Sequence, residues 1–112
     1  MNPERRQSPR KKAAVQAELL LHGRTVPLRV STTDLSLTGC YIENMYTLPI
    51  GARLKIGLWI EEEKLKISGI VKTCDPVFGN GIQFLEMSAE SHDQLKKYLD
   101  KRDRGIGALK QS

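Results

Sequence analysis

The chain has 112 residues, of which 39% are apolar and 28% are charged, and its formal net charge is +5. This length predicts one compact domain and excludes most large enzyme scaffolds. The apolar content is too high for a disordered chain. The positive charge favours an anionic partner without saying which one.

Much of this charge is concentrated at the N-terminus. Residues 1–12 contain five basic residues and one acidic residue, a net charge of +4. We expect this segment to be a flexible basic arm in front of a folded domain at residues 13–102. No apolar run reaches the roughly 18 residues that span a bilayer, and no secretory core follows the arm. We therefore expect a cytoplasmic protein without a membrane span.

Apolar and polar residues alternate over most of the domain, which indicates β-strands. The first two expected strands form a hairpin, in which Pro27 indicates a free edge or a bulge. A loop with Gly79 and Gly81 is expected before the last strand, and these glycines permit a bulge more readily than they cradle a phosphate. The expected strands cover residues 15–21, 26–30, 40–42, 54–60, 65–71 and 82–84.

The apolar period then changes to that of a helix. Ser88 can cap this helix, and Leu95, Tyr98 and Leu99 form its apolar stripe. Residues 103–112 are expected to be a disordered tail. Six short strands with one apolar face each most economically close into a small barrel. The predicted fold is therefore mainly all-β, a six-stranded antiparallel β-barrel with a C-terminal α-helix.

Two polar clusters are not explained by the core. The first contains Arg6 and Arg10 with three residues between them, on a segment that Pro9 keeps from being a regular helix. A guanidinium group can bind phosphate in a forked geometry, pair with the O6/N7 edge of guanine, or stack on a base. Taken alone, a basic N-terminus is also typical of a solvated tail.

The second cluster is Asp34-Leu35-Ser36-Leu37-Thr38-Gly39, between the expected second and third strands. Asp34 and Ser36 point the same way on an extended chain, and Gly39 permits a close approach that a β-carbon blocks. A carboxylate can accept from the N1–H and amino group of guanine, and a hydroxyl can bind a base or a phosphate. The same pattern is also that of an ordinary turn.

Together, these two motifs resemble the PilZ domain family of bacterial cyclic di-GMP receptors. Gly79-Asn80-Gly81-Ile82-Gln83-Phe84 is similar to the late strand of that family, and the final helix agrees with it. The resemblance covers residues from about Glu4 to Asp100. It implies a six-stranded barrel that binds cyclic di-GMP at its surface without catalysis and needs no cofactor.

Carried over residue by residue, the resemblance implies that Arg6 and Arg10 grip phosphates and guanine edges. Asp34 and Ser36 then read guanine, while Gly39 shapes the turn. Arg5 stands at a position similar to a stoichiometry selector, where an arginine favours an intercalated dimer of the ligand. Pro9 departs from the motif and either presets the approach of the arm or misaligns it.

Additional candidate site residues are Trp59 and Gly81. Trp59 lies in the polar phase of its strand, so we expect it to point outward and to stack on a ligand or cover the barrel. The leading hypothesis is a cyclic di-GMP receptor that changes its arm position and surface and signals to a separate protein in motility or biofilm regulation. The alternatives are a PilZ-like interaction module without nucleotide and a small RNA- or single-strand-binding barrel. No DNA partner, metal site or enzyme activity is expected.

Overall fold

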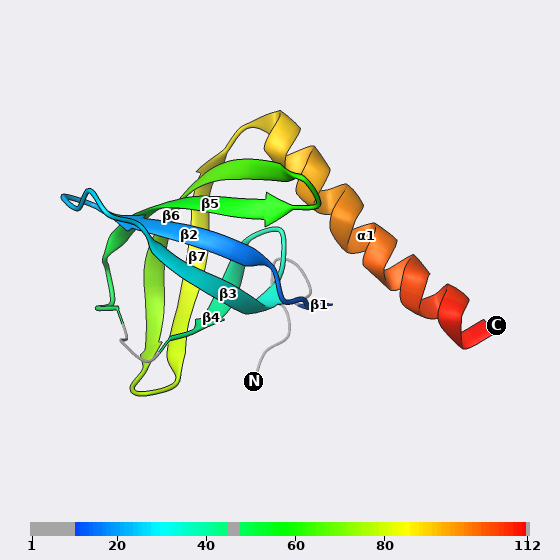
Figure 1. Ribbon diagram of the computed structural model, residues 1–112, viewed down its shortest axis with the longest axis horizontal. Helices are drawn as coiled ribbons and strands as arrows, with labels where there is room; N and C mark the ends of the chain where they lie inside the picture. Colours follow the sequence, from blue (N-terminus) through cyan, green and yellow to red (C-terminus); the bar gives the residue numbers. More distant parts are fainter. Residues whose placement is uncertain (1–10, 45–47, 112) are drawn as a thin grey trace.

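The computed structural model describes residues 11–44 and 48–111, and it contains a six-stranded antiparallel barrel followed by one helix (Figure 1). The barrel closes because β3 pairs with both β2 and β4, so the sheet order returns to its start. A two-residue strand, β1, pairs with the end of β3. The strands are β1 (Lys11–Lys12), β2 (Gln16–Leu21), β3 (Leu28–Leu35), β4 (Gly39–Glu43), β5 (Arg53–Ile60), β6 (Glu63–Asp75) and β7 (Gly79–Met87).

The apolar residues that alternate with polar ones in the sequence point into the barrel and fill its interior. Leu19, Leu35, Ile42 and Leu58 are fully buried from four different strands. Apart from Gly57, their neighbours within these strands are half-buried or exposed, as the two-residue period of a strand favours. The fold predicted from the sequence is confirmed, with the addition of β1.

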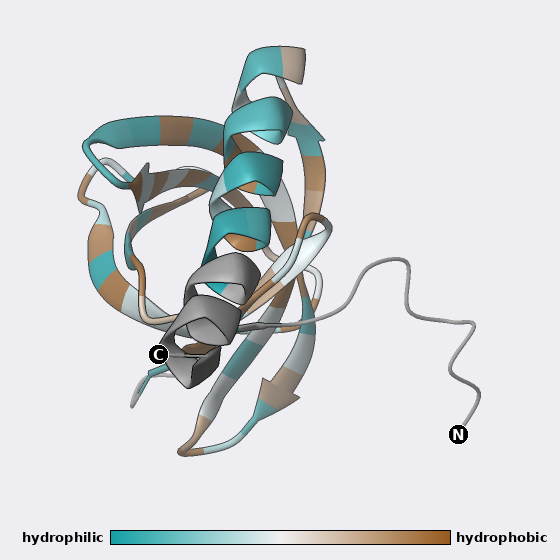
Figure 2. Cartoon of the chain, turned by 90° about the vertical axis from the view of Figure 1, so that its right-hand side faces the viewer, coloured by the Kyte–Doolittle hydropathy of each residue, from teal (hydrophilic) through white to brown (hydrophobic). Residues whose placement is uncertain are grey.

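The helix α1 (Ala89–Gln111) follows the barrel directly. Ser88 Oγ accepts a hydrogen bond from the Ser91 amide at 3.0 Å, which confirms the predicted cap. Leu95 and Leu99 are buried against the barrel, while the visible surface of the described turns is mostly hydrophilic (Figure 2). Within the described residues, no helix has both the length and the apolar character that crossing a membrane requires.

Several expected boundaries are wrong. β3 begins at Leu28, not at residue 26, because Pro27 has no amide to donate to a neighbouring strand. Gly79 and Gly81 lie within β7 and not in a loop before it. α1 is assigned up to Gln111 and so does not end at residue 102, whereas the expected disorder of residues 103–112 stays a prediction. Extending an existing helix is cheaper than nucleating one, and Gly105 and Gly107 only weaken it.

Candidate functional site

The second polar cluster forms a tight connection between β3 and β4. Asp34 is still part of β3, Ser36 is the first residue of the connection, and Gly39 begins β4. The sequence pattern indicated that Asp34 lies between two strands, but the structure places it within β3. We call this connection the Asp34–Gly39 turn. The three predicted residues are brought together there, but they have different roles.

Ser36 closes the turn. Its side chain is buried, with 3% of the residue exposed, and its Oγ accepts hydrogen bonds from the amides of Thr38 and Gly39, both at 3.1 Å. The Ser36 amide donates to the Gly39 carbonyl at 2.9 Å. This is the ordinary turn chemistry that the sequence left open. The structure thus gives Ser36 a structural role, and its contact with a ligand stays a prediction.

Gly39 allows two strands to approach closely. A β-carbon at this position would lie 2.4 Å from the backbone carbonyl oxygen of Ile82 on β7. Atoms at that distance clash, and a backbone oxygen in a barrel wall cannot easily move away. The prediction that Gly39 permits a close approach is confirmed.

Asp34 points to the outer face of the barrel between two neighbours. It is paired across the strands with Lys12 on β1 and with Tyr41 on β4. Lys12 Nζ lies 3.2 Å from Asp34 Oδ1, and 22% of the Asp34 side chain is exposed. Asp34 Oδ1 itself is buried, and among the described residues this ion pair with Lys12 is its one contact in place of a hydrogen bond. Buried oxygens without a hydrogen bond are rare in proteins, so this atom suits a donor from a ligand.

Tyr41 extends the outer surface beyond Asp34. Its hydroxyl donates to Asp75 Oδ2 at 2.7 Å, and this hydrogen bond is the main reason why the pKa of Tyr41 is raised to about 12. The hydroxyl therefore stays protonated near neutral pH and does not serve as a base. Its bond to the carboxylate holds the ring in one place beside Asp34.

Gly81 on β7 pairs across the strands with Tyr41 on β4, which in turn pairs with Asp34 on β3. It is buried under Thr73, whose Oγ1 accepts from the Gly81 amide at 3.0 Å. The pairing between β6 and β7 shifts by one residue here, so that Lys72 is the extra residue of a bulge. The bulge predicted near Gly81 is confirmed. Two strand spacings of roughly 5 Å each separate Gly81 from Asp34.

Trp59 lies on the outer face of β5, as predicted, with 40% of the residue exposed. Lys64 Nζ lies 5.5 Å from the centre of its ring. The same Nζ atom also forms an ion pair with Glu18, at 2.9 Å from Glu18 Oε2. Trp59 is thus occupied by a residue of its own chain, and a contact with a ligand stays a prediction.

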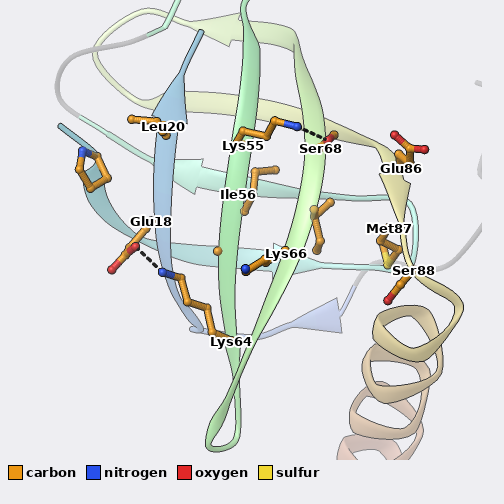
Figure 3. Close-up of a pocket in the computed structure, with 13 residues that line it drawn as sticks. Glu18, Leu20, Lys55, Ile56, Lys64, Lys66, Ser68, Glu86, Met87 and Ser88 are labelled. Carbon is orange, nitrogen blue, oxygen red and sulfur yellow. Dashed lines mark hydrogen bonds and ion pairs between the residues drawn. The ribbon is translucent and has the colours of Figure 1, made fainter. Parts of the chain in front are cut away.

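An open cavity of about 610 Å³ lies on the outside of β2, β5, β6 and β7 (Figure 3). We call it the outer-wall cavity. Glu18, Lys64 and Gly57 line one part of it, and Lys55 donates to Ser68 at 3.4 Å in another. None of the predicted site residues lines this cavity. Cavity size and predicted chemistry therefore point to different places, and the chemistry is the better guide because a ligand is recognised by specific donors and acceptors.

Arg5, Arg6 and Arg10 lie outside the described residues. The structure nevertheless places the residue that follows them. Lys11 pairs with Leu35, and Lys12 pairs with Asp34. The arginine motif therefore ends one residue before a strand that lies against the Asp34–Gly39 turn, although some two dozen residues separate the two motifs in the sequence.

Three residues near the site were missed as candidates. Lys12 was counted only as part of the basic arm, and Tyr41 was interpreted as a surface strand residue. Arg102, on α1, donates from Nη2 to the Lys12 carbonyl at 2.8 Å. The alternation at residues 40–43 could have indicated that Tyr41 shares the outer face with Asp34. No sequence signal links Arg102 to Lys12.

The PilZ domain family profile matches residues 4–101, which is most of the chain. The chain belongs to the PilZ domain family. A search of curated proteins finds no match to this PilZ domain.

Solved structures with the same fold support this assignment. The PilZ domain of YcgR from Escherichia coli, solved with c-di-GMP, is 17% identical, has a TM-score of 0.74, and is covered over 98% of its length by 96% of this chain. MotI/DgrA, an inhibitor of motility from Bacillus subtilis, is 18% identical with a TM-score of 0.75; 90% of this chain covers 52% of it. This PilZ domain thus spans about half of MotI/DgrA. At these identities, the likeness shows the fold.

The K. pneumonia MrkH–c-di-GMP complex is a further neighbour, with 17% identity and a TM-score of 0.65. There, 96% of this chain covers 56% of the other. Of these three chains, the PilZ domain of YcgR is covered over nearly its whole length, and MotI/DgrA and MrkH are covered over about half of theirs.

Proposed function

We propose that this PilZ domain is a receptor for cyclic di-GMP. The observation that carries the proposal is the buried Asp34 Oδ1, whose partner among the described residues is the exposed ammonium group of Lys12, with no hydrogen bond besides this ion pair. Guanine offers two adjacent donors, N1–H and the amino group, which suit a carboxylate. YcgR and MrkH, which share the fold, were solved with c-di-GMP.

The pairing of β1 supplies the second part of the argument. Because Lys12 lies beside Asp34, the arm that carries Arg6 and Arg10 starts at the edge of the same surface. We expect the ligand to bring these arginines onto the barrel, where they bind phosphate and the guanine Hoogsteen edge. Several charge-assisted hydrogen bonds of about 1.5–3 kcal/mol each are enough for micromolar affinity after the arm is ordered.

Binding has to displace Lys12 from Asp34. The Lys12 side chain is 88% exposed, so the ion pair is weak, roughly 0–1 kcal/mol. Guanine donors can therefore replace it at little cost. The displaced ammonium group stays near the phosphates, which carry the opposite charge. Arg5 lies next to Arg6 and is the candidate that stacks on a second nucleotide in an intercalated ligand dimer.

The proposed output is a change of surface. When the arm moves onto the Asp34–Gly39 turn, it covers one part of the barrel and exposes another, and a separate protein reads the difference. MotI/DgrA is an inhibitor of motility, which supports a role in motility or biofilm regulation. A receptor for this second messenger is expected to act in the cytoplasm as a binding protein rather than an enzyme.

Calorimetric titration tests the proposal. We expect cyclic di-GMP to bind with micromolar or better affinity, and GMP, GTP and cyclic di-AMP to bind at least tenfold more weakly. Arg6→Ala and Arg10→Ala should each remove most of the binding, whereas Arg29→Ala, on the outer face of β3, should not. Failure of cyclic di-GMP to bind the wild-type chain contradicts the proposal and favours the interaction module.

A further inference from the structure

Arg102 connects the helix to the strand from which the arm starts. Its Nη2 donates to the Lys12 carbonyl at 2.8 Å, so residues 90 positions apart in the chain are in contact. The guanidinium group lies 5.8 Å from the centre of the Tyr98 ring, and Nη1 is 3.4 Å from the Tyr98 hydroxyl. These contacts along one face of α1 hold the guanidinium group in place.

The strand that receives this bond needs support. β1 has only two residues, and a strand of this length has few hydrogen bonds of its own. The Ala13 amide donates to the Thr33 carbonyl at 3.1 Å, and the Thr32 hydroxyl donates to the Ala13 carbonyl at 2.5 Å. Both of these contacts come from β3. Arg102 holds β1 from outside the sheet.

The hydrogen bond from Arg102 does not involve the side chains of Lys12 or Asp34. Arg102 binds the backbone of Lys12, whereas the ammonium group of Lys12 lies on Asp34. A ligand can therefore displace the ammonium group while the backbone of Lys12 stays anchored. Arg10 precedes this anchor by two residues in the sequence.

We propose that Arg102 is a positioning residue of the ligand site, which fixes the backbone of Lys12 beside Asp34, at the strand from which the arm with Arg10 and Arg6 starts. This inference rests on the proposed function. Ordering the backbone of one residue is costly, so releasing one or two residues at the base of the arm weakens binding by about tenfold. The helix is then part of the receptor site and not only a cover for the barrel.

A matched pair of helix variants tests this role. Arg102→Met removes the donor and the charge but keeps a flexible apolar stem. Lys101→Met removes the same charge from the next residue, whose Nζ pairs with Glu61 at 2.9 Å and not with β1. Arg102→Lys restores one donor. Each full-length variant is titrated with cyclic di-GMP at low and high salt, and exchange of the Ala13 amide is measured without ligand.

We expect Arg102→Met to bind about tenfold more weakly and to exchange the Ala13 amide faster. Lys101→Met should stay within twofold of the wild type in both measurements, and Arg102→Lys should recover most of the affinity. The salt dependence should be the same for Arg102→Met as for Lys101→Met, because neither side chain contacts the phosphates.

Three results overturn the inference. If Arg102→Met binds as well as Lys101→Met, the inference fails and the proposed function stands. If Arg102→Met loses more salt dependence than Lys101→Met, Arg102 contacts the ligand directly and is not a positioning residue. If the wild type does not bind cyclic di-GMP, the proposed function fails, and the Ala13 exchange rates show only whether Arg102 anchors β1.

Discussion

The Asp34–Gly39 turn and the outer-wall cavity contain the same kinds of residue. Each has a carboxylate paired with a lysine, and the distances are 3.2 Å for Asp34–Lys12 and 2.9 Å for Glu18–Lys64. Each also has a serine and a glycine. The regions differ in what surrounds these residues, and this difference separates a specific site from a hollow in the surface.

The glycines show the difference most directly. A β-carbon on Gly39 would meet a backbone oxygen of Ile82, whereas a β-carbon on Gly57 would meet the Cε of Lys64. The first neighbour is fixed by the barrel, and the second is near the end of a flexible side chain. Backbone contacts therefore shape the turn, while movable side chains line the cavity.

The serines differ in the same way. Ser36 is buried and satisfies two backbone amides, whereas Ser68 is half-buried and receives one long bond from Lys55. A ligand meets a preorganised surface at the turn, and it must reorganise long side chains in the cavity. Preorganisation lowers the cost of binding, so the smaller feature is the better candidate.

The largest expected effect is on the fold. Gly39→Ala should lower the free energy of unfolding by about 3 kcal/mol, because β4 and β7 must separate to admit the methyl group. Gly57→Ala should cost less than about 1 kcal/mol, since Lys64 can move. Urea denaturation of both variants measures this difference. Equal losses would contradict the distinction between a fixed turn and a movable cavity.

The next effect is on binding. Asp34→Ala should weaken cyclic di-GMP binding by about 2 kcal/mol, or roughly 30-fold, because it removes charge-assisted acceptors for guanine. It should also reduce the preference for cyclic di-GMP over cyclic di-AMP. Glu18→Ala, in the outer-wall cavity, is the control and should leave calorimetric binding unchanged. The reverse pattern would place the ligand in the cavity.

A smaller effect is expected for the serines. Ser36→Ala should lower the free energy of unfolding by about 1 kcal/mol, because the amides of Thr38 and Gly39 lose their acceptor. Ser68→Ala should be neutral within about 0.5 kcal/mol. Thermal unfolding followed by circular dichroism measures both changes. A stable Ser36→Ala variant that loses ligand binding would show that the hydroxyl contacts the ligand.

The smallest effect concerns pH. The hydrogen bond from Lys64 is the main cause that lowers the pKa of Glu18 below 4.5. A lowered pKa stabilises the fold above pH 4.5, and this contribution is lost as the pH falls through the folded pKa. Lys64→Met should move the Glu18 pKa back towards 4.5 in an NMR titration. An unchanged pKa would show that the ion pair does not persist in solution.

Local patterns predicted much of the fold. The alternation at residues 54–60 identified β5, and Ser88 with Leu95 and Leu99 identified the helix and its buried face. These signals succeed because burial on one face of a strand or helix imposes a period on the sequence. The sequence also placed the turn at Asp34–Gly39 and assigned Gly39 its close approach.

Contacts between distant segments could not be predicted in the same way. The β1 strand is too short to show a period, and its partner is about two dozen residues away. The contact of Arg102 with Lys12 joins two basic residues that no charge pattern would pair, because the bond is to a backbone carbonyl. The resemblance assigned Ser36 to the ligand, and that contact stays a prediction; its burial could not be predicted because it depends on how the turn closes.

The central claim is that this PilZ domain binds cyclic di-GMP at the Asp34–Gly39 turn. The most direct test is a nuclear magnetic resonance titration of the labelled full chain with cyclic di-GMP. We predict saturable shifts of the amides of Asp34, Ser36 and Gly39, with little change at Gly57 and Ser68. Shifts confined to the outer-wall cavity, or no shifts at millimolar ligand, would contradict the account.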